Sequence, residues 1–75
     1  MAKLPRISGK ELLRFLQRER FTVVRVRWSH HELTRDEVDT VVPVHGNRTM
    51  AIGTLRKILR DIDMTLDEFA ERFNT

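Results

Sequence analysis

Residues 21–44, FTVVRVRWSHHELTRDEVDTVVPV, decide the fold of this chain because they have the pattern of three consecutive strands. Apolar and polar residues alternate over Phe21–Trp28 and predict the first strand. His30–Arg35 is long enough for a second strand, and Asp36-Glu37 is a predicted hairpin tip. Val38–Val44 then supplies the third strand. The stretch therefore predicts an antiparallel meander.

Helical patterns flank this meander on both sides. Ser8-Gly9-Lys10-Glu11 has the pattern of a capping box and opens a leucine-rich helix over about residues 9–19. After the turn His45-Gly46-Asn47, apolar residues at helical spacing predict a helix over about residues 51–61. Thr65-Leu66-Asp67-Glu68 is a second capping box and opens a short last helix. The element order is therefore α-β-β-β-α with a terminal α.

This order predicts an α+β fold in which the helices cover one face of a three-stranded antiparallel sheet. We expect residues 1–75 to form one domain, with the opposite sheet face open to solvent or a ligand. One proline and one glycine are informative by their position. Pro43 has no N–H to donate, so its strand should lie at a sheet edge there or pair with its N–H side free. Gly53 costs up to ~1 kcal/mol in a helix relative to Ala, which suggests close approach of a partner there.

Charge is unevenly distributed along the chain. Residues 1–60 carry thirteen Lys or Arg against six Asp or Glu, whereas residues 61–75 carry one against five. A basic body suggests a partner that bears phosphates. The alternative is that these arginines form an ordinary solvated surface.

Composition also argues against several classes of protein. The chain has no Cys, so it can form neither a disulfide framework nor a thiolate metal site. No apolar run approaches the roughly 20 residues that span a bilayer, and no apolar segment follows the N-terminal charges as in a secretory signal. We therefore expect a cytoplasmic protein without a membrane anchor.

Two adjacent histidines lie at the start of the second predicted strand and must point to opposite faces. Leu33 is the apolar residue of that strand and shares its face with His31. If Leu33 packs on the helices, His31 is turned inward with it. His30 then points to the open face, together with Glu32.

The same alternation in the first strand predicts which side chains join His30. It buries Val24, Val26 and Trp28, and it places Val23, Arg25 and Arg27 on the other side, which is the open face. The open face thus gathers one histidine and two arginines. A histidine can move a proton near neutral pH, and arginine forks match phosphate oxygens. This set could cleave RNA, although an isolated strand histidine is more often a surface residue.

Metal binding is not expected from the residues. His30, His31 and His45 have no carboxylate pair at a ligand spacing, and neighbouring strand histidines diverge. We therefore predict neither a metal nor a cofactor.

Taken together, these segments resemble the HicA family of bacterial toxin mRNA interferases over roughly residues 7–62. The resemblance is carried by Ser8-Gly9-Lys10-Glu11, Phe21–Arg27, Ser29-His30-His31, Val42–Gly46 and Ile52–Leu59. It implies a fold similar to a double-stranded-RNA-binding domain and metal-independent endoribonuclease cleavage of mRNA. It also implies a HicB-type antitoxin as partner. The catalytic histidine of the family directly follows the serine of its Ser-His motif, which here is His30.

The sequence departs from the family pattern at two positions. The family usually has Gly immediately before Ser-His, where this chain has Trp28, and Gly before the aromatic residue that opens the first strand, where it has Arg20. A Trp removes backbone freedom and could crowd the approach to His30. Alternation places its indole in the core; the alternative is that the indole stacks on an unpaired base.

Phosphate contacts are predicted for the two arginines of the open face and for Arg56 and Lys57, which lie near the anion-attracting start of the second long helix. For Arg56 the alternative is pairing with Asp61 or exposure to solvent. The predicted RNA-binding set is Arg25, Arg27, Ser29, Arg56 and Lys57. We expect a monomer or weak dimer alone and a higher-order complex with the antitoxin.

Two other functions fit the same sequence. One is a non-catalytic module that binds double-stranded RNA, for which the fold and basic surface would serve equally well. The other is a protein-interaction domain whose basic face meets an acidic partner.

Overall fold

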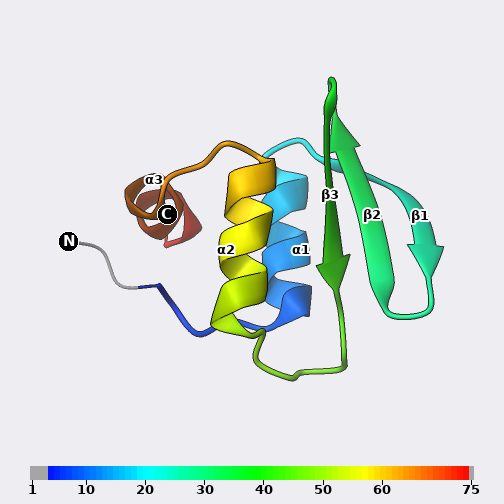
Figure 1. Cartoon of the computed structure of the whole chain (residues 1–75), viewed down its shortest axis with the longest axis horizontal. Helices are drawn as coiled ribbons and strands as arrows, with labels where there is room; N and C mark the ends of the chain where they lie inside the picture. The colour runs from blue at the N-terminus through cyan, green and yellow to red at the C-terminus, as the bar shows by residue number, and fades with distance from the viewer. Residues whose placement is uncertain (1–3, 75) are drawn as a thin grey trace.

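The computed structural model describes residues 4–74 and confirms the predicted order of elements. A helix, three strands and two further helices follow one another along the chain (Figure 1). Their bounds are Gly9–Arg18 (α1), Thr22–Arg27 (β1), His30–Arg35 (β2), Val38–Pro43 (β3), Ile52–Asp61 (α2) and Leu66–Phe73 (α3). The fold is therefore α+β, α-β-β-β-α with an extra C-terminal helix.

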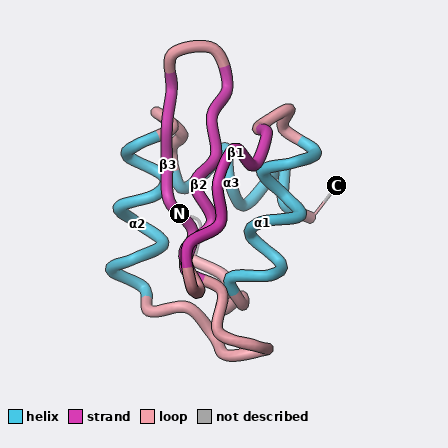
Figure 2. The backbone as a smooth tube through the Cα atoms, turned by 90° about the vertical axis from the view of Figure 1, so that its right-hand side faces the viewer, coloured by secondary structure: helices cyan, strands magenta, loops and turns pink. Residues whose placement is uncertain are grey.

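The three strands form one antiparallel sheet in the order β1-β2-β3. Helices α1 and α2 lie side by side on one face of this sheet, and α3 lies on the far side of that helix pair (Figure 1). Figure 2 views the molecule from the side of the sheet, with the helices behind it. The strand β3, which ends at Pro43, is an edge strand as its proline predicts.

Both predicted capping boxes are formed. The Ser8 hydroxyl accepts from the Glu11 N–H at 3.1 Å, and the Glu11 carboxylate accepts from the Ser8 N–H at 3.0 Å. Thr65 and Glu68 make the same reciprocal pair at the start of α3, at 3.1 and 2.9 Å. The backbone N–H of Thr65 that donates to the Glu68 carboxylate lowers the pKa of that group, with help from the Thr65 hydroxyl and from Arg72.

Gly9 sets how closely α1 approaches the sheet. A Cβ added to Gly9 would overlap the carbonyl oxygen of Pro43, and it would lie 3.2 Å from the Val44 Cα. A side chain at this position would therefore push the start of α1 away from the end of β3. Gly53 differs, since an added Cβ there would meet nothing within 4 Å.

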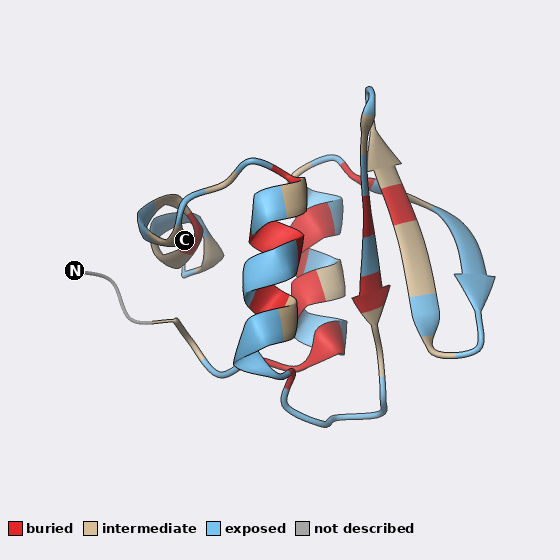
Figure 3. Ribbon diagram, viewed as in Figure 1, coloured by how far each residue is buried: buried red, intermediate tan, exposed pale blue. Residues whose placement is uncertain are grey.

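The core lies between the sheet and the helices, and a phenylalanine cluster extends it to α3. Phe15 of α1 packs edge-on against Phe69 of α3, with ring centroids 5.0 Å apart, and it also contacts Phe73 at 5.8 Å. Buried residues lie on the facing sides of α1, α2 and the sheet, as the colours of Figure 3 show. The largest fully buried ones are Phe15, Phe69, Leu12, Leu16, Leu33, Leu55, Ile58 and Val42.

The predicted burial of Val24, Val26 and Trp28 is wrong. Their exposed fractions are 60%, 56% and 88%. The helix pair packs mainly against β3, and β1 is the strand furthest from it, so little covers β1 on either face (Figure 3). Alternation indicates which side chains share a face, but it does not show whether a helix covers that face.

The predicted outward position of Val23 is also wrong, and a β-bulge is the reason. Val23 pairs with Leu33 and Arg25 pairs with Glu32, so Val24 is an extra residue in β1. The extra residue reverses the alternation. Val23 consequently packs against the core with Leu33, while Arg25 lies on the opposite face with Glu32.

Candidate functional site

The two histidines lie on opposite faces of β2, as predicted. His31 is half-buried, and its cross-strand partners are Val26 and the fully buried Val42. Its Nδ1 lies 3.4 Å from the Ser29 carbonyl oxygen. His30 is exposed and lies on the face turned away from the helices. His30 is therefore the histidine that a ligand on the open face can reach.

Cross-strand pairing places a basic side chain next to His30. Arg27 of β1 and Pro43 of β3 are the partners of His30 on either side. In the next row of the open face, Arg25 and Val41 flank Glu32. Side chains directly opposite in antiparallel strands have Cβ atoms about 5 Å apart. The open face therefore carries the predicted combination of His30, Arg25 and Arg27 within two adjacent rows.

The turn between β1 and β2 consists of Trp28 and Ser29 alone. Ser29 is half-buried, and its carbonyl oxygen accepts from the Val44 N–H at 2.7 Å, which ties the turn to the end of β3. Trp28 has a φ of +55° and Arg20 a φ of +74°. A non-glycine residue in this region costs about 1–2 kcal/mol. These are the two positions at which the sequence lacks the glycines of the pattern that it resembles.

A hollow lies beside Pro43, at the same end of the sheet as His30. It is lined by Gly9, Pro43, His45, Arg48, Thr49, Met50, Ala51 and Thr54. The segment between β3 and α2 supplies His45 and Arg48, which are exposed side chains. Sequence reasoning assigned no role to Arg48. An arginine just after the Gly46 turn, at the end where α1 and α2 both begin (Figure 1), is the signal that could have singled it out.

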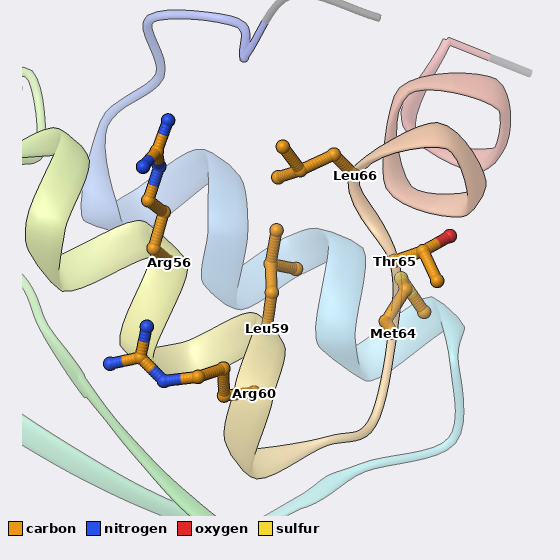
Figure 4. A pocket seen from close by; sticks show the side chains of 6 residues that line it. All are labelled: Arg56, Leu59, Arg60, Met64, Thr65 and Leu66. Atoms are coloured by element: carbon orange, nitrogen blue, oxygen red, sulfur yellow. The ribbon is translucent and has the colours of Figure 1, made fainter.

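Arg56 and Lys57 are not brought to the open face. Arg56 borders a hollow between α2 and the start of α3, together with Leu59, Arg60, Met64, Thr65 and Leu66 (Figure 4). Lys57 lies on another side of α2, where its Nζ pairs with the Asp61 carboxylate at 3.2 Å. The same carboxylate oxygen accepts from the Thr40 hydroxyl at 3.0 Å. Both residues are thus separated from His30 by the sheet.

Metal-binding clusters and membrane-spanning helices are both absent from the part of the chain that the structure describes. Across residues 4–74, no three His, Asp or Glu side chains gather closely enough to hold a metal ion. Over the same residues, no helix has the length and apolar character needed to cross a membrane.

An open sheet face with an exposed histidine and two arginines offers groups that can bind phosphate oxygens and transfer a proton. The family described as the HicA toxin of bacterial toxin–antitoxin systems matches residues 9–64, which is most of the chain. The protein belongs to this HicA toxin family. It is therefore a toxin component, and its family implies an antitoxin partner. The search of curated proteins gave no match.

Proposed function

We propose that this toxin is an endoribonuclease that cleaves mRNA on the open face of its sheet, with His30 as the catalytic residue. The observation that carries the proposal is the pairing of exposed His30 with Arg27 across the β1–β2 turn. This pairing puts an imidazole, a side chain that can both accept and donate a proton, next to a permanent positive charge. An RNA phosphate between them would meet both a proton-transfer group and an electrostatic clamp.

The cleavage needs no external nucleophile, because RNA carries its own. The 2′-oxygen attacks the adjacent phosphorus and loses its proton, and the bond from phosphorus to the 5′-oxygen of the next nucleotide breaks. The 5′-oxygen takes up a proton as it leaves. His30 acts as the general acid or base in these transfers. The products are a 2′,3′-cyclic phosphate and a 5′-hydroxyl end, and the reaction does not depend on a metal ion.

Arg27 and Arg25 supply the positive charge that the transition state requires. Negative charge builds on the phosphate oxygens during the attack, and guanidinium groups placed in advance stabilise it. Ser29 holds the turn beside them and is a further RNA contact. Arg56 and Lys57 would contact only RNA that extends around the domain to α2, so their role as phosphate ligands is a separate prediction.

Glu32 is a candidate for the second proton-transfer group. It lies two residues beyond His30 on the same face of β2, which corresponds to about 7 Å between Cα atoms in a strand. That spacing would allow the two side chains to flank one phosphate. The carboxylate also faces Arg25 across the strands, so Glu32 could orient that arginine.

The antitoxin, a HicB-type protein in this proposal, would act by covering the same face. Buried arginines are costly unless they are paired. A partner that masks Arg25, Arg27 and His30 should therefore present carboxylates there, in the way that RNA presents phosphates. We expect the free toxin to be a monomer or weak dimer that acts on cytoplasmic mRNA, and the complex to be larger.

Inducible expression of the toxin in bacterial cells, without its antitoxin, tests the proposal. The unaltered chain should arrest growth and degrade mRNA, while His30→Ala should accumulate as a folded protein and do neither. Equal toxicity of the two would remove His30 from the mechanism. Tight binding of duplex RNA without cleavage by the unaltered chain would instead favour a non-catalytic RNA-binding module.

A further inference from the structure

Trp28 is the most exposed large apolar side chain among residues 4–74, with 88% of its surface accessible. The ring contacts and cation–π contacts in this part of the chain involve only phenylalanine rings. The indole therefore contributes nothing to the core that packs the sheet against the helices.

The backbone conformation at Trp28 is a second reason why the stability of the fold does not account for a tryptophan at this position. Its φ of +55° lies in the left-handed region, where a bulky side chain is an outlier and Gly, Asn or Asp is preferred in a two-residue turn. A glycine would close the same turn without strain. Neither burial nor turn geometry accounts for a tryptophan at this position, which points to a partner outside the chain.

The neighbours of Trp28 indicate what that partner is. Trp28 lies in the turn that Arg27 and His30 close, so its indole is attached directly beside the proposed cleavage site. Aromatic rings next to basic side chains are the usual platform for single-stranded RNA, because bases stack on the ring while the cations hold the phosphates. The flanking charges thus favour a nucleic acid over an apolar protein surface.

We infer that Trp28 is a stacking subsite for one unpaired nucleobase of the RNA strand whose phosphate lies at His30. The inference rests on the proposed function and adds a substrate class to it. Bases within a duplex are stacked on one another and offer no free face. The preferred substrate is accordingly an unpaired segment of RNA, held at the base by Trp28 and at the phosphates by Arg25 and Arg27.

Trp28 is the sole tryptophan of the chain, so intrinsic fluorescence reports on this residue alone. A short single-stranded oligoribonucleotide is titrated into His30→Ala, which binds RNA in this account but does not cleave it. We expect the Trp28 emission to be quenched as the RNA binds. Each nucleotide of the oligonucleotide is then replaced singly by an abasic one, and the replacement at one position should abolish the quenching.

Variants at Trp28 separate stacking from electrostatic attraction, with affinities measured by anisotropy of a labelled RNA. In the His30→Ala background, Trp28→Gly should weaken binding by about 5-fold to 150-fold, the range of one base–aromatic stack. Trp28→Phe should retain most of the affinity. The salt dependence of binding should not change in either variant, because stacking releases no counterions. Trp28→Gly should also be at least as thermostable as its parent, which excludes misfolding as the cause.

The outcomes distinguish this inference from the proposed function. Equal RNA affinity of Trp28→Gly and its parent, with cleavage by the chain that retains His30, would overturn the stacking subsite and leave the endoribonuclease standing. Absence of both RNA binding and cleavage would remove both. A fluorescence change on adding the antitoxin but not on adding RNA would overturn the subsite and make Trp28 part of a protein interface.

Discussion

Arg27 and His30 are cross-strand partners that close the two-residue turn between β1 and β2. Because the pairing is set by backbone hydrogen bonds, it places the two side chains on one face of the sheet and does not require them to contact each other. A hydrogen bond from the Val44 N–H to the Ser29 carbonyl joins this turn to the end of β3. The proposed catalytic group therefore lies where backbone hydrogen bonds join all three strands.

Reversing the charges on the open face should weaken RNA binding in a salt-dependent way. Arg25→Glu with Arg27→Glu removes two predicted phosphate contacts, and each contact to single-stranded RNA contributes about −0.7 to the slope of log affinity against log salt. We expect the slope to flatten by roughly one to two units, measured by salt titration of the His30→Ala protein.

The matched control for this charge reversal is Arg56→Glu with Lys57→Glu, which changes the net charge by the same amount. These residues lie on α2, away from the open face. A short RNA that reaches only the open face should keep nearly the parental slope in this control. Equal flattening of the slope by both pairs of substitutions would mean that RNA affinity depends only on the overall charge, and it would contradict a localised phosphate site.

Gly9→Ala should destabilise the fold. The added methyl group overlaps the Pro43 carbonyl oxygen, which belongs to backbone and cannot rotate away. Forced overpacking of this kind typically lowers the free energy of unfolding by about 1–3 kcal/mol, which denaturant titration would detect. The matched control is Gly53→Ala, where nothing lies within 4 Å and helix propensity should raise stability by up to ~1 kcal/mol. Unchanged stability of Gly9→Ala would show that α1 does not approach β3 as described.

Glu32→Gln distinguishes a catalytic carboxylate from one that only balances charge. If Glu32 transfers a proton, the substitution should lower kcat and remove one limb from the pH profile of cleavage, while RNA binds as well as before or better. Better binding follows because the amide no longer repels phosphates. Single-turnover cleavage across a range of pH provides the measurement. An unaltered pH profile with a raised rate would assign Glu32 to charge balance alone.

The antitoxin should compete with RNA for the open face. We predict that the purified HicB-type partner displaces labelled RNA from His30→Ala, and that Arg25→Glu with Arg27→Glu weakens the toxin–antitoxin complex, because the partner's carboxylates then face like charges. Affinity measured by titration calorimetry gives the comparison. Simultaneous binding of RNA and antitoxin would contradict direct masking.

The order of elements could be predicted from the sequence because its signals are local. Both capping boxes, the Asp36-Glu37 hairpin tip and the helical spacing depend on residues close together in the chain, and each is formed in the structure. The opposite faces of His30 and His31 were predictable for the same reason, since β2 is regular throughout.

The errors concern features that local patterns do not encode. The bulge at Val24 reverses the alternation of β1, and no turn residue or glycine marks its position. The exposure of Val26 and Trp28 depends on how far the helix pair extends across the sheet, which is a tertiary property. The position of Arg56 relative to His30, which the sequence left open, likewise depends on which side of α2 is turned toward α3.

Cleavage of RNA by the purified protein is the most direct test of endoribonuclease activity at His30, with His31→Ala as the matched control for His30→Ala. His31 is half-buried beside Val42, so His31→Ala should lower the free energy of unfolding by about 1–2 kcal/mol yet still cleave while folded. His30→Ala should keep the parental stability and lose cleavage. We expect 2′,3′-cyclic phosphate ends from the unaltered chain and from His31→Ala, in the presence of a metal chelator, and none from His30→Ala. Cleavage by His30→Ala at the parental rate, or loss of cleavage in a fully folded His31→Ala alone, would contradict the catalytic role of His30.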